Sequence, residues 1–72
     1  MTNFISDYER AVAQNLLDFP NWRYGQTLFN TLFETKPDLA EKIIGTEIDP
    51  FHMLNNERGI SDFWAWLFNE MD

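Results

Sequence analysis

Apolar residues recur every three or four positions along much of the chain, as they do in helices that bury one face. A first helix is predicted to begin at the capping box Ser6–Glu9 and to end before Pro20, because proline disfavours a helical residue before it. Leu17 falls outside the apolar stripe of this helix, where it can touch a second neighbour. The stripe itself consists of Ile5, Tyr8, Val12, Leu16 and Phe19.

A second helix is predicted from the N-cap candidate Asn21 to about Glu34. Glycine inside a helix costs about 1 kcal/mol relative to alanine. Gly25 lies on the face expected to be buried, so we interpret it as a point of close approach for another helix. That buried face comprises Trp22, Gly25, Leu28, Phe29, Leu32 and Phe33. The opposite face carries Arg23, Thr27, Asn30 and Thr31, with Tyr24 and Gln26 at its edges.

Three further signals complete the pattern. Pro37 suits the first turn of a third, shorter helix that is expected to stop at Gly45. Asp49-Pro50 predicts a single helical turn to about Leu54. A last helix is predicted to start near Ser61, with Trp66 projecting away from the apolar face. That face consists of Ile60, Phe63, Trp64, Leu67, Phe68 and Met71.

No strand-like alternation persists anywhere, and there is no internal repeat. The prediction is therefore an all-α protein, a compact bundle of four helices plus one short helical turn. Residues 1–72 are expected to form a single small helical domain.

Three short motifs resemble a group of small hypothetical proteins from bacteria and their phages. They are Arg23-Tyr24-Gly25-Gln26, Leu28-Phe29-Asn30 and Asp49-Pro50-Phe51, followed by an aromatic last helix. The resemblance covers roughly Asn21 to Leu67. It implies a shared fold and no activity.

Charge and composition exclude several classes of protein. The chain has 12 Asp and Glu against 5 Lys and Arg, hence a formal net charge of −7. That charge disfavours both direct nucleic-acid binding and docking on an anionic membrane surface. No apolar run approaches the roughly 18 residues of a membrane span, and no signal peptide is recognisable. A cytoplasmic location is the expectation, and without cysteine no disulfide can staple the small core.

The sequence offers little material for catalysis. His52 is the single histidine, and Asp49 lies three residues before it. An acid–base pair is possible at that spacing, but helix-cap preference already explains Asp49. One histidine and no cysteine cannot form a structural zinc site, and no glycine-rich phosphate loop is present. We therefore expect no enzyme activity, no metal and no cofactor.

Residues left over from the core pattern point to binding of another protein. Trp66 falls on the polar side of the last helix, and Tyr24 falls beside the buried face of the second. If the fold brings them together, they form an amphipathic docking patch with Arg23, Gln26 and Asn30. Alternatively, Trp66 packs under the Asn55–Gly59 loop or the N-terminal segment, and Tyr24 covers an edge of the core.

Two functional interpretations follow. The first is a non-catalytic protein-interaction module with a protein partner, or a homo-oligomer that associates through its C-terminal aromatic helix. The second is a phage-type acidic inhibitor or DNA mimic that binds a nucleic-acid-binding host protein. Acids scattered along the chain, with basic residues between them, favour the first interpretation.

Overall fold

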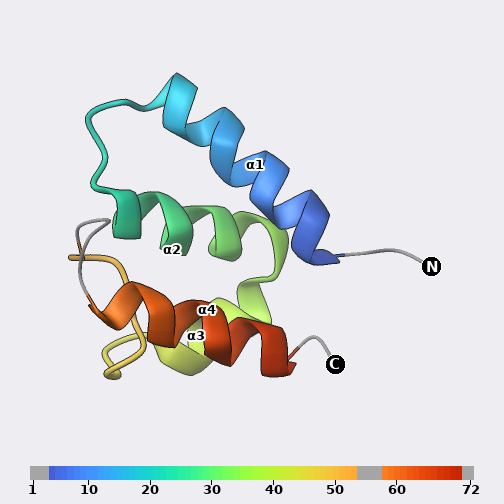
Figure 1. The fold of residues 1–72 in the computed structure, drawn as a ribbon, viewed down its shortest axis with the longest axis vertical. Helices are drawn as coiled ribbons and strands as arrows, with labels where there is room; N and C mark the ends of the chain where they lie inside the picture. Colours follow the sequence, from blue (N-terminus) through green and yellow to red (C-terminus); the bar gives the residue numbers. More distant parts are fainter. Residues whose placement is uncertain (1–3, 54–57, 71–72) are drawn as a thin grey trace.

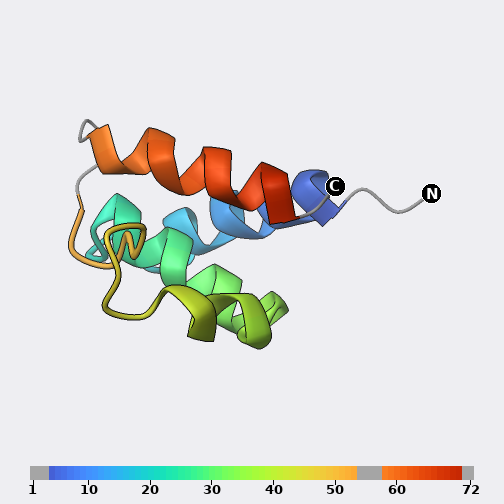
Figure 2. The same ribbon diagram turned by 90° about the horizontal axis from the view of Figure 1, so that it is seen from below.

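Four helices and their connections make up the computed structural model, which describes residues 4–53 and 58–70. The helices are α1 (Phe4–Asp18), α2 (Tyr24–Thr35), α3 (Pro37–Ile43) and α4 (Arg58–Glu70). The described residues contain no strand, so the predicted all-α bundle is confirmed. Helix α2 runs between α1 and α3 (Figure 1), and α3 and α4 lie on either side of it when the molecule is turned (Figure 2).

Tyr8 of α1 lies where three helices meet. Its side chain is fully buried, and its hydroxyl donates a 2.5 Å hydrogen bond to the carbonyl of Leu28 in α2. Its ring packs edge-on against Trp64 of α4, with the ring centroids 5.6 Å apart, and stacks on Phe4. The buried core around it contains Tyr8, Val12, Leu28, Leu32, Leu39, Ala40, Ile43, Ile60, Phe63 and Leu67.

The side of α2 that carries Thr27 and Thr31 is buried, although the sequence pattern placed both on the polar outer face. The Thr31 hydroxyl donates to the Thr27 carbonyl at 2.7 Å and accepts a 2.8 Å hydrogen bond from the Asn15 side chain of α1. Threonine can be buried in a helix when its hydroxyl bonds the carbonyl one turn earlier. Phe33, by contrast, was predicted to be buried and is 47% exposed.

The helix ends match the predicted ones where proline determines the boundary. They differ where a polar N-cap residue was expected. Helix α1 ends at Asp18, ahead of Pro20, as predicted. Ser6 lies inside α1, and Ser61 lies inside α4, which begins at Arg58, so neither serine caps a helix. Asn21 is not a cap either, because the Phe19 and Trp22 rings stack at 4.2 Å in a turn that delays α2 until Tyr24.

The first turn of α2 is covered by the segment before α4. The N–H of Gly25 donates to the carbonyl of Met53 at 2.9 Å, which satisfies an amide that the N-cap side chain does not reach. A Cβ atom at Gly25 would lie 2.7 Å from that carbonyl oxygen and still nearer the carbonyl of Pro50. Gly25 is therefore a point of close approach, but the neighbour is an irregular segment rather than the predicted helix.

Helix α3 and the connection after it follow the sequence closely. Pro37 opens α3 in its first turn, and Gly45 after its end has φ 76°, a conformation that favours glycine. Asp49 accepts hydrogen bonds at 3.0 Å from the backbone N–H groups of Gly45 and Phe51. The predicted helical turn is a single 2.8 Å hydrogen bond from Met53 N–H to Pro50, and its expected end at Leu54 lies outside the described residues.

None of the helices described here is both long enough and apolar enough to cross a bilayer.

Replacement of Gly25 by alanine is expected to lower the free energy of unfolding by about 1–3 kcal/mol, because two backbone carbonyls occupy the space of the new methyl group. The matched control is Gly59→Ala, where only the flexible side chain of Met53 stands in the way. The control should be neutral or stabilising, since alanine favours the helix by about 1 kcal/mol. Urea denaturation of both variants checks this, and equal effects would contradict the close approach at Gly25.

Stability should fall at alkaline pH through Tyr8. Burial, with a smaller contribution from Tyr24, raises the pKa of Tyr8 far above its ordinary value in an unfolded chain. The folded state therefore holds the phenol neutral, and its stabilisation is complete below about pH 10 and lost above it, by up to about 1.4 kcal/mol per pH unit. Tyr8→Phe should lose about 1 kcal/mol at neutral pH, from the missing hydrogen bond, and show a smaller alkaline loss.

Urea denaturation between about pH 8 and pH 11 measures both effects on Tyr8. Tyr24→Phe is the control, because it removes a phenol that is only half-buried and leaves Tyr8 in place. If the loss of unfolding free energy at alkaline pH disappears in Tyr24→Phe and persists in Tyr8→Phe, the assignment of this loss to Tyr8 is contradicted.

Candidate functional site

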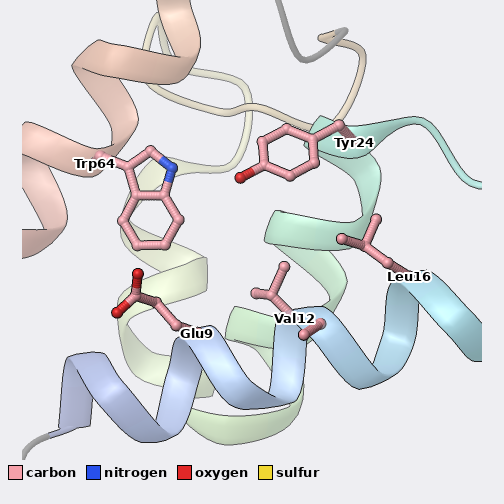
Figure 3. A pocket seen from close by; sticks show the side chains of 6 residues that line it. Glu9, Val12, Leu16, Tyr24 and Trp64 are labelled. Carbon is pink, nitrogen blue, oxygen red and sulfur yellow. The ribbon is translucent and has the colours of Figure 1, made fainter.

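The five residues predicted to bind a partner do not gather in one patch. Tyr24 lies on the side of α2 that faces α1 and α4 (Figure 3). Gln26 follows it by two positions, about 200° around the helix, and Asn30 shares the face of Gln26. Arg23 precedes α2 and is exposed. The predicted patch is thus divided between two sides of the central helix.

Trp66 belongs to a different helix, α4. It lies on the flank of α4 that also carries Glu70 one turn later. Glu70 forms a 3.0 Å ion pair with Lys42 of α3, so this flank is turned toward α3. The Trp66 ring packs against Phe63 with a centroid distance of 6.0 Å, and its side chain is half-buried against the core. Most of the loop proposed to cover it lies outside the described residues.

Gln26 and Asn30 border an aromatic face that the sequence pattern assigned to the core. Phe33 is exposed on this face, and Phe29 packs edge-on against Phe51 with the ring centroids 5.9 Å apart. Both polar side chains are half-buried. This outer face of α2 is therefore amphipathic.

A groove lies on the other side of the molecule, between α1 and α4 and beside the first turn of α2 (Figure 3). Its volume is about 200 Å³. Three different helices contribute to it, so it exists only in the folded chain. The groove is lined by Glu9, Val12, Ala13, Leu16, Tyr24 and Trp64.

The walls of the groove are apolar and supported by the core. Val12 forms part of its floor and is buried, whereas Leu16 is 39% exposed at its edge. Trp64 is held in place by Tyr8 on one side and by Phe63, at a ring-centroid distance of 5.8 Å. The sequence pattern assigned Trp64 to the core stripe, and the structure gives it a second role as a half-exposed wall.

Two polar groups face the groove. Figure 3 shows the Glu9 side chain rising from α1 toward the Trp64 ring and the Tyr24 hydroxyl pointing into the same space. Within the described part of the chain, no donor bonds the Glu9 carboxylate and no group bonds the Tyr24 hydroxyl. Glu9 lies on the groove side of α1, whereas the sequence pattern assigned it to a capping box with Ser6.

Neither catalysis nor metal binding is favoured by the described side chains. Asp49 directs its carboxylate oxygens to the backbone N–H groups of Gly45 and Phe51, and exposed His52 contacts the Phe51 ring instead. The described ranges contain no cluster of three potential metal ligands.

Large apolar side chains are exposed close to the groove. Phe68 of α4 is 52% exposed and packs against Trp64, with their ring centroids 6.2 Å apart. Leu17, predicted to touch a second neighbour, is instead 78% exposed on α1, one position after Leu16. We call the groove residues together with Phe68 the α1–α4 surface.

Comparisons with known proteins identify no relative of this chain. No family model, no curated protein and no solved structure matches the chain. The resemblance to small bacterial and phage proteins therefore stays a prediction, and the function rests on the structure itself.

Truncation of Trp66 and Phe68 should separate core packing from surface exposure. Trp66→Ala is expected to lower the free energy of unfolding by about 2 kcal/mol, because its half-buried ring supports Phe63. Phe68→Ala, two positions away and more exposed, should cost about 1 kcal/mol or less. Denaturation midpoints measure the difference, and a larger loss from Phe68→Ala would contradict the packing described for α4.

Proposed function

We propose that this chain is a non-catalytic protein-interaction module that binds its partner, or a second copy of itself, through the α1–α4 surface. One observation carries the proposal: exposed Leu16 and half-buried Trp64 line one groove, and exposed Phe68 packs against Trp64. Single exposed apolar residues are common on proteins, but adjoining ones around a concavity are typical of binding sites.

The proposed surface keeps the interaction-module interpretation made from the sequence, but most of its residues differ from those predicted. The C-terminal aromatic helix still contributes, through Trp64 and Phe68, and Tyr24 stays in the site. Trp66 is replaced because it is not among the described residues that line the groove, and Gln26 and Asn30 lie on the outer face of α2. Arg23, which is exposed just before that helix, is not required by the proposal.

The acidic-inhibitor interpretation has weaker support. A DNA mimic presents its carboxylates as one continuous negative face. The described carboxylates are distributed over all four helices and the connection after α3. Two of them are paired with bases, Asp7 with Arg10 and Glu70 with Lys42. The same proposal includes a cytoplasmic location and no enzyme activity.

A photo-crosslinking phenylalanine analogue at position 68 tests the proposed function in the native host. The control carries the same analogue at Ile44, which is 55% exposed at the end of α3 and so matches the 52% exposure of Phe68. We expect defined crosslinked species from position 68 that the control does not form, either near twice the 8.6 kDa chain mass or with a distinct partner. Identical species from both positions, or none from position 68, would overturn the proposal.

A further inference from the structure

The groove carries one charged group among apolar walls, and that group has no partner. Glu9 is exposed at the mouth, and no described residue donates to its carboxylate. Among the described residues, no lysine, arginine or histidine lines the groove. With a net charge of −7 on the chain, the site presents unbalanced negative charge to whatever enters.

Size limits the occupant to a single side chain. Pockets that bind drug-sized molecules and cofactors measure roughly 300–1,000 Å³. This groove measures about 200 Å³ and is open at the surface, as Figure 3 shows. It is thus small for a free cofactor and suitable for one long side chain that projects from a partner protein.

The lining selects the chemistry of that side chain. Val12 and Leu16 provide apolar contact for an aliphatic stem, and the Trp64 and Tyr24 rings provide faces on which a cation is attracted. A carboxylate would be repelled by Glu9, and a purely apolar chain would leave the negative charge uncompensated. Arginine fits best, because its planar guanidinium can stack on an indole while its N–H groups donate to a carboxylate and a hydroxyl.

We propose that the groove binds an arginine side chain of the partner protein, with the guanidinium between Trp64 and Tyr24 and paired to Glu9. The proposal rests on the proposed function and identifies the chemistry that the partner presents. The stem of the arginine lies along Val12 and Leu16, and the Tyr24 hydroxyl accepts a hydrogen bond from the guanidinium. Glu9 supplies the selectivity for positive charge, since it is the ionised group in the lining.

A blocked Gly-Arg-Gly tripeptide is the probe, and the same tripeptide with citrulline is its uncharged counterpart of nearly equal shape. Titration at low ionic strength, followed through the indole N–H resonance of Trp64, measures binding. We expect saturable shifts with the arginine peptide and much weaker ones with the citrulline peptide. Glu9→Gln should lower the affinity for the arginine peptide by about three- to fivefold, as expected for a partly exposed ion pair.

The matched control is Glu41→Gln, which removes the same charge from an exposed position on α3 away from the groove. It should leave the affinity nearly unchanged. Equal weakening by the two variants would show that only net charge matters, and equal binding of citrulline would show that the cation is not recognised. Either result overturns the arginine assignment.

Failure of the arginine assignment is distinguishable from failure of the proposed function. Suppose that the protein binds the arginine and citrulline tripeptides equally while position 68 still gives its own crosslinked species. The α1–α4 surface then remains an interaction surface with a different occupant. If the crosslinked species are absent as well, the proposed function fails with it.

Discussion

Burial of the Tyr8 phenol is the constraint on which the other packing depends. Its hydroxyl reaches the Leu28 carbonyl in the middle of α2, so α1 can lie against α2 in one register only. A phenol that is removed from water must find an acceptor, and a misplaced α1 would leave it without one. The same ring supports Trp64, which fixes the position of α4 against the first two helices. One residue thereby couples three helices in a chain that has no disulfide to do so.

The groove is a consequence of this arrangement. Large aromatic side chains, Tyr8 and Trp64, separate α1 from α4, and the space beside them is not filled by the small side chain of Ala13 or by Leu16. Trp64 thus contributes both to the core packing and to the wall of the groove. Because the walls are held by core contacts, the site is preformed, and binding there would require little ordering of side chains. A small protein can in this way combine stability and recognition in the same few residues.

Much of the fold could be predicted from local rules. Pro20, Pro37 and Gly45 mark boundaries through their own backbone restrictions, and the structure places helix ends beside each of them. Serine and asparagine caps were less reliable, because a side chain that can cap a helix can equally lie within one. Ser6 and Ser61 do so, and Asn21 is bypassed when Phe19 stacks on Trp22. The candidate site was predicted less well: Tyr24 was named, but Glu9 was assigned to a capping box and Trp64 to the core.

The sequence by itself determined the helical class, the prolines and glycines that divide the chain, and most of the core, since these depend on backbone restriction and on apolar periodicity. Only the tertiary structure decided which sides of α2 are buried. A helix packed on several sides has no single polar face, so Thr27 and Thr31 are buried and Phe33 is exposed. The same applies to the groove, because the Glu9 carboxylate, Tyr24 and Trp64 are far apart in sequence and meet only when α1, α2 and α4 pack around Tyr8.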